Sequence, residues 1–165
     1  MLHGTDIQFT EVILPKDTIC AYTYFSFSQG IVSIEPPKTD WDLLLTQYTT
    51  TLYTDDGVPT PYFVRGVLLN PWRTTGALDT SHIFEGITIA DTINMSFTQA
   101  RDVIGHDWKY VKVNEQTNTA DYFVRPKHSY LVTDSEGGVF KIRFTGFYSK
   151  DFEPGYPSFD YLKLN

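Results

Sequence analysis

The residues with the clearest capacity for chemistry lie in and beside an irregular stretch, residues 70–91. His82 is followed there by Ile83 and Phe84, so apolar surface accompanies an imidazole that binds metal ions when neutral. Met95, shortly after the stretch, carries a soft thioether that could bind a metal ion from the opposite side. Loops of about 20 residues are uncommon in compact domains and are often functional. We therefore treat His82 as a candidate metal ligand and Met95 as a weaker one, while a solvated histidine and a core methionine remain open interpretations.

Two further histidines have structural interpretations beside chemical ones. His106 follows a predicted helix and is expected to cap its carbonyl groups rather than to bind a metal ion. His128 opens a predicted strand, where a structural or exposed role is expected. Three aromatic pairs could line a flat slot, although aromatic residues at strand spacing usually belong to a core. The pairs are Tyr24 with Phe25, Tyr122 with Phe123, and Phe147 with Tyr148.

Two pairs of carboxylates could support acid–base hydrolysis if one member had a raised pKa. Asp40 and Asp42 share one face of a predicted strand, and Asp55 and Asp56 lie in a predicted turn. Carboxylates of a solvated turn usually keep their ordinary acidity. The sequence therefore predicts no enzyme, and we assign no catalytic residue.

The elements that would position these side chains are mostly strands, because Thr, Val and aromatic residues dominate the periodic segments. Turn signals at Asp56-Gly57 and at residues 135–138 predict two hairpins. A capping box, Ser96 with Gln99, predicts one short helix at about 96–104. The expected fold is an all-β antiparallel sandwich or open barrel with that single helix. Strands are predicted at residues 7–14, 19–27, 31–34, 41–53, 62–69, 108–113, 121–124, 129–133, 139–148 and 156–164.

Length and composition limit the classes of function. A chain of 165 residues is expected to form a single domain. Residues 1–6 are expected to be disordered or not to belong to the natural protein. The net charge of −7 and the pI near 4.9 argue against binding to nucleic acid or to an anionic membrane surface. The lone cysteine, Cys20, excludes an intrachain disulfide. No apolar run reaches the length of a membrane-spanning helix.

Six segments occur along the chain in a recognisable order. They are residues 21–30, the pair Trp41-Asp42, and residues 63–70, 104–109, 139–144 and 155–161. Together they resemble the HmuY family of haem-binding proteins of Bacteroidetes, over roughly residues 20–162. The resemblance implies an exported all-β protein at the outer-membrane surface or outside the cell, often a lipoprotein. It also implies that haem is captured and delivered to a TonB-dependent outer-membrane receptor.

The best-known members of that family bind the haem iron through two histidines on separate loops. His82 lies in the first of these loops, whereas the second, residues 114–118, has neither histidine nor methionine. Beside His82, Trp72 would contact the haem and Arg73 would pair with a propionate. A module of the same fold that recognises another ligand or partner stays an alternative. Residues 1–4 lack the pattern of a signal peptide, so we expect membrane attachment only through a lipid anchor on a segment outside this sequence.

Overall fold

The computed structural model describes residues 8–165, and its contacts divide the chain into two units, Met1–Asp40 and Trp41–Asn165. Each unit is described by itself. The expectation for residues 1–6 lies outside the described residues. None of the helices within residues 8–165 is long and apolar enough to cross a membrane.

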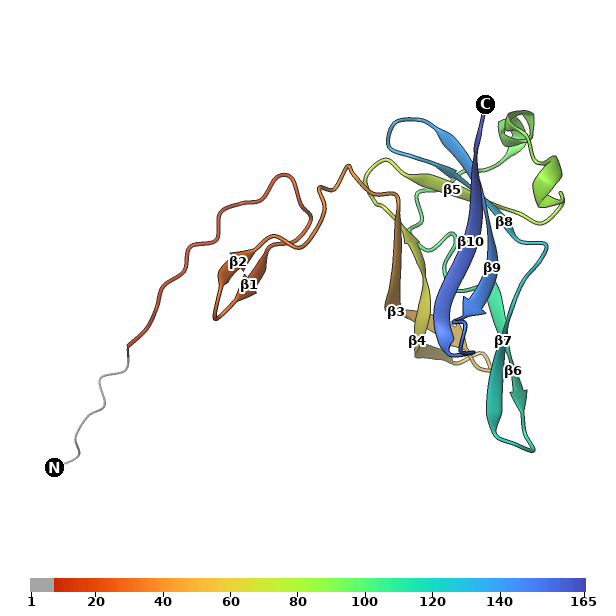
Figure 1. Ribbon diagram of the computed structural model, residues 1–165, viewed down its shortest axis with the longest axis horizontal. Helices are drawn as coiled ribbons and strands as arrows, with labels where there is room; N and C mark the ends of the chain where they lie inside the picture. Colours follow the sequence, from red (N-terminus) through yellow and green to blue (C-terminus); the bar gives the residue numbers. More distant parts are fainter. Residues whose placement is uncertain (1–7) are drawn as a thin grey trace. The chain divides into compact units, whose positions relative to one another are not determined.

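The first unit contains one short antiparallel hairpin, in which β1 (Tyr24–Ser26) pairs with β2 (Gly30–Val32) (Figure 1). The strand predicted over residues 7–14 is wrong for the described part, residues 8–14, and the one predicted over 19–27 forms only at β1. A strand forms only where a neighbouring strand accepts and donates its backbone hydrogen bonds. The periodicity of a sequence does not show whether such a neighbour exists.

The second unit holds three antiparallel sheets (Figure 1). A four-stranded sheet has the order β10-β9-β8-β5, and two hairpins are formed by β3 with β4 and by β6 with β7. The prediction of an all-β antiparallel fold, a sandwich or an open barrel, is confirmed: the sheets are antiparallel, do not close into a barrel and agree with a sandwich. The strands are β3 (Leu43–Tyr53), β4 (Pro59–Leu69), β5 (Thr75–Asp79), β6 (Lys109–Asn114), β7 (Thr119–Val124), β8 (Ser129–Thr133), β9 (Val139–Tyr148) and β10 (Pro154–Leu164).

The main core joins the β3–β4 hairpin to the four-stranded sheet. Trp108 lies at its centre, stacked on Phe144 with ring centroids 4.2 Å apart and edge-on to Phe147 at 5.6 Å. Burial of apolar area supplies most of the stabilisation of such a core. Its buried members are Val67, Leu69, Ile104, Trp108, Tyr130, Val132, Ile142, Phe144 and Phe147.

The central strand β8 has both faces covered, because successive side chains of a strand point to opposite sides. Tyr130 and Val132 belong to the main core, whereas Leu131 packs with Ile87 and Leu164 in a second cluster. Two 3-10 turns, η1 (Phe84–Gly86) and η2 (Ile89–Asn94), flank Ile87 of that second cluster.

The helix predicted at 96–104 does not form, and this part of the fold prediction is wrong. The segment and the following Gly105 instead pair with strand edges: the backbone N–H groups of Leu69 and Val67 donate to the carbonyl oxygens of Arg101 and Gly105 at 2.7 and 2.8 Å. Gly66 permits this approach, since a Cβ there would collide with the Gly105 carbonyl. Nine residues make a marginal helix, so pairing with unsatisfied strand backbone outweighs the local capping box.

Two boundaries also differ from the prediction. Residues 70–91 are not one irregular loop, because β5 lies within them and pairs with β8. Pro59 and Pro61 belong to β4 rather than to the preceding turn. Proline is accepted there because β4 pairs with one strand only, β3, at this end.

Candidate functional site

The largest of the three cavities described in the second unit has a volume of about 660 Å³. It lies between the β3–β4 hairpin and the β6–β7 hairpin, with Phe147 of β9 also in its wall. Cavities of this size suit drug-sized ligands, and rings on several sides favour a flat apolar one. The aromatic lining residues are Tyr62, Phe63, Tyr110, Tyr122 and Phe147. We refer to this space as the hairpin cavity.

Lys109 is the buried charge of the hairpin cavity, with 9% of its surface exposed. Its Nζ donates a hydrogen bond to the Arg65 carbonyl at 2.5 Å and lies 4.4 Å from the Trp108 ring and 4.8 Å from the Phe147 ring. Burial lowers the pKa of Lys109 to about 8. The amine therefore stays mainly charged at neutral pH at a cost in folding free energy, which an anionic ligand would offset.

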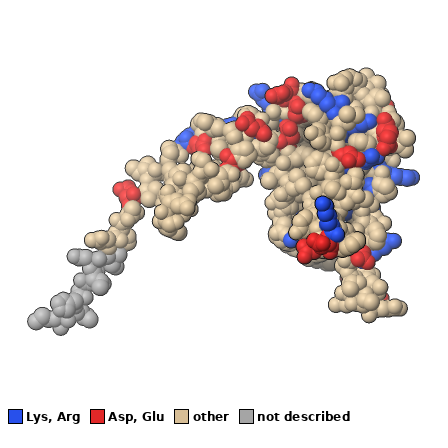
Figure 2. All heavy atoms as spheres, in the orientation of Figure 1, with Lys and Arg blue, Asp and Glu red and all other residues tan. Residues whose placement is uncertain are grey.

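Two arginines extend this positive charge along the hairpin cavity. With its amide oxygen turned toward Arg65, Gln47 accepts hydrogen bonds from Nε and Nη2 at 2.6 and 3.1 Å. The Arg125 guanidinium carbon lies 5.3 Å from the Tyr110 ring centroid. Among the residues that line the hairpin cavity, Asp107 is the acidic one. On the molecular face shown in Figure 2, acidic and basic side chains are interspersed. Three cations around one cavity in a chain of net charge −7 favour an anionic ligand there.

His106 supplies the imidazole among the lining residues of the hairpin cavity. Its Nε2 lies 3.5 Å from Asp107 Oδ1, and 26% of the side chain is exposed. The interpretation of His106 as a helix cap is wrong, because residues 96–104 form no helix. The structure instead places a potential metal ligand beside the three cations.

His82 lies after β5 and is half-exposed, with 48% of its side chain accessible. Its Nδ1 is 2.8 Å from Asp79 Oδ2, and its Nε2 is 3.9 Å from Asp91 Oδ1. Asp79 also accepts hydrogen bonds from the backbone N–H groups of Ser81 and His82. A carboxylate on one ring nitrogen is the usual support of a metal-bound histidine. None of the three cavities is lined by His82.

The Asp79 carboxylate raises the pKa of His82, chiefly through the hydrogen bond to Nδ1. Because the folded pKa exceeds the unfolded value of about 6.5, this interaction stabilises the fold below about pH 6.5 and is lost as pH rises through the folded pKa. We expect Asp79→Asn to lower the pKa of His82, measured by NMR titration of the imidazole protons. Asp91→Asn should lower it less, and equal pKa values in wild type and Asp79→Asn would contradict this account.

The comparison with family models matches residues 19–161 to the family described as HmuY protein. The chain belongs to the HmuY family. Among solved structures, a Bacteroides fragilis protein assigned as a lipoprotein is 16% identical, with 84% of this chain and 75% of that chain covered. Its TM-score of 0.34 is too low to support a structural argument. The comparison with curated proteins gave no match.

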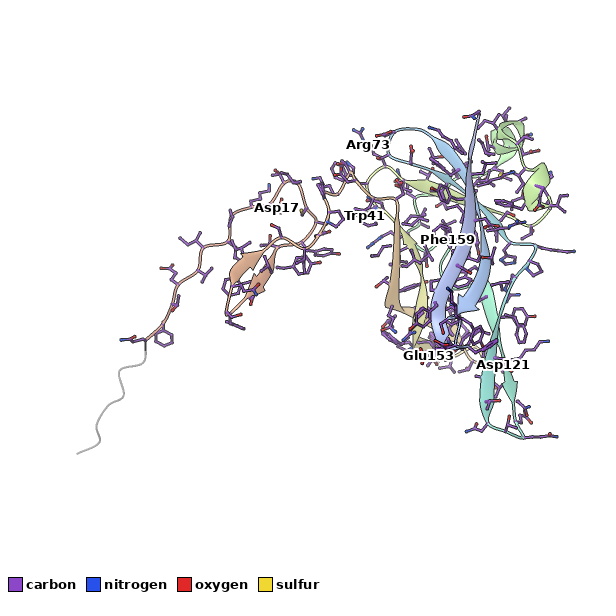
Figure 3. The ribbon with its side chains drawn as sticks, in the orientation of Figure 1. Asp17, Trp41, Arg73, Asp121, Glu153 and Phe159 are labelled. Atoms are coloured by element: carbon purple, nitrogen blue, oxygen red, sulfur yellow. The ribbon has the colours of Figure 1, made fainter. Side chains whose placement is uncertain are left out.

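In this HmuY-family protein two of the remaining predicted site residues, Trp72 and Arg73, do not lie beside His82. Trp72 and Arg73 precede β5 and His82 follows it, so the strand, roughly 13 Å long at 3.3 Å per residue, lies between them. Figure 3 shows Arg73 at the end of β5 remote from the 3-10 turns. Met95 packs against the second core cluster with Phe97. That contact agrees with the core interpretation of Met95.

Sequence reasoning missed the three cations and interpreted His106 as a helix cap, because it sought the site in the long loop that holds His82. The available signal was weak, because other aromatic strands of the chain also carry charged residues, such as Lys141 and Arg143 in β9. Arg65 lies inside β4, Lys109 opens β6 and Arg125 directly follows β7. Of the aromatic pairs considered, Tyr122 and Phe147 do line the hairpin cavity.

Proposed function

We propose that this HmuY-family protein is an exported surface protein that captures haem in the hairpin cavity and passes it to a TonB-dependent outer-membrane receptor. The observation that best supports this is the gathering of Arg65, Lys109 and Arg125 around an aromatic-walled slot of about 660 Å³. Haem is a flat apolar ring with two carboxylates. The aromatic side chains would cover its faces, and the cations would pair with the carboxylates.

His106 is the iron ligand that this proposal requires, because it is the imidazole of the cavity lining. One-sided ligation would hold haem less firmly than a pair of histidines, which favours release to a receptor. Val111 and Val113, at the β6 side of the cavity, are 48% and 62% exposed. An open, apolar rim of this kind would let a receptor reach the bound ring.

A haemin titration followed at the Soret band tests the proposal. The wild-type protein should give a saturable, red-shifted band, and His106→Ala should remove the shift while weakening binding about tenfold or more. His82→Ala is the matched control and should leave the spectrum unchanged. If His82→Ala alone abolishes the shift, the iron site lies after β5 and the assignment to His106 is wrong.

A second function is favoured by the single imidazole of the cavity lining: recognition of a flat anionic ligand that contains no iron. Iron-free protoporphyrin IX distinguishes the two. Binding of protoporphyrin as tight as that of haemin would support this second function, whereas clearly tighter binding of haemin would support haem capture.

A further inference from the structure

We propose that a second pocket, at the opposite ends of β3 and β9 from the hairpin cavity, binds the head group of an organic ammonium ion. This pocket has a volume of about 330 Å³ and shares no lining residue with the hairpin cavity. We refer to it as the acidic pocket. The inference does not depend on haem binding.

One wall of the acidic pocket consists of three aromatic side chains from two adjacent strands. Phe140 of β9 and Tyr161 of β10 have ring centroids 6.4 Å apart, and Phe159 lies 6.4 Å from Tyr161 along β10. Figure 3 shows Phe159 on β10. Ring faces attract cations, and several rings around one space form the usual receptor for alkylammonium groups.

The polar part of the acidic pocket consists of two carboxylates, Asp42 and Asp134. Asp134 is fixed by the β8–β9 turn, where its Oδ1 accepts hydrogen bonds from the N–H groups of Glu136 and Gly138 at 2.9 and 2.6 Å. Asp42 is held through its carbonyl, which accepts a hydrogen bond from Asn70 N at 2.8 Å. The Asp42 carboxylate itself accepts a hydrogen bond from the backbone of Ser135, so both carboxylates are held before any ligand arrives.

The two carboxylates repel each other in this position. Burial, followed by the charge of Asp134, raises the pKa of Asp42, while a backbone hydrogen bond from Ser135 opposes the rise. Glu136 adds a further negative charge nearby. None of the lining residues is basic. A cation between the carboxylates and the rings would relieve this repulsion, so charge complementarity selects an ammonium over a neutral or anionic occupant.

Lys163 already makes a contact between a cation and one of these aromatic rings. It pairs across β10 and β9 with Phe140, and its Nζ lies 5.7 Å from the Phe140 ring centroid. The amine is not among the pocket-lining residues, but it already contacts the Phe140 ring that an entering cation would also contact. Removing Lys163 should therefore strengthen binding of an external ammonium.

The test is a titration of the full chain with choline, followed by backbone amide shifts in NMR at constant ionic strength. Saturable shifts are expected in residues 132–142 and 159–161. The uncharged isostere 3,3-dimethyl-1-butanol should produce no saturable shifts. Asp42→Asn should raise the Kd for choline about tenfold, and Lys163→Ala should lower it about two- to threefold.

Asp56→Asn is the matched control, because Asp56 is an exposed turn carboxylate outside the pocket. Its Kd should equal that of the wild type. Absence of saturable shifts with choline, or equal affinity for the neutral isostere, would overturn the proposal. Lys163→Ala keeps the proposal testable if Asp42→Asn does not fold, since unchanged affinity in that variant would also contradict it.

Discussion

Replacing Lys109 with Met is expected to weaken haemin binding about 10- to 100-fold without destabilising the fold at pH 7. The loss reflects one buried charge-assisted hydrogen bond to a ligand carboxylate, worth about 1.5–3 kcal/mol. Met keeps much of the apolar stem that contacts the Trp108 and Phe147 rings. The measurement is a pair of titrations, with haemin and with its dimethyl ester, which lacks the carboxylates.

The wild-type protein should prefer haemin to the ester, and Lys109→Met should remove most of that preference. Stability gives an independent check, because the pKa of Lys109 is about 8 in the fold and about 10.4 in an unfolded chain. Between these values the unfolded chain binds more protons, so wild-type stability should rise with pH relative to the variant. An unaltered preference for haemin in Lys109→Met would contradict the assignment of Lys109 to the ligand site.

Trp108→Ala is expected to lower the free energy of unfolding by about 3–5 kcal/mol. Trp108 is 2% exposed and contacts two aromatic rings of β9, so the truncation would leave a cavity where the hairpins meet the four-stranded sheet. Urea unfolding followed by circular dichroism measures the change without relying on tryptophan fluorescence.

Trp72→Ala is the matched control for Trp108, because 43% of the Trp72 surface is exposed in the loop before β5. Trp72→Ala should lower the free energy of unfolding by less than about 1 kcal/mol. A similar loss in both variants would mean that Trp108 is not the centre of the core.

Local sequence signals were sufficient to predict elements whose backbone partners lie close in sequence. The hairpin of β8 and β9 was predicted with its observed bounds, because a short polar turn with Gly137 at φ +88° separates two apolar strands. The segment 96–104 was predicted as a helix from its capping box, but its backbone pairs with Leu69 and Gly76, which are distant in sequence. Such long-range backbone pairing leaves no local signature.

The same distinction explains why the site could be predicted only in part. Family resemblance indicated a ligand-binding protein, and His82 was a reasonable candidate from its loop and neighbours. The hairpin cavity, however, is assembled from segments far apart in sequence: the Lys109 amine meets the Arg65 carbonyl across 44 residues. Burial of Lys109 and its lowered pKa depend on that assembly and are not visible in the sequence.

NMR mapping with gallium protoporphyrin IX, a diamagnetic analogue of haem, tests the location of the ligand most directly. If the hairpin cavity holds the ring, amide shifts should concentrate at residues 62–65, 106–113 and 120–125, with Lys109 among the largest. Shifts confined to residues 79–95 around His82, or no shifts at saturating ligand, would contradict the account.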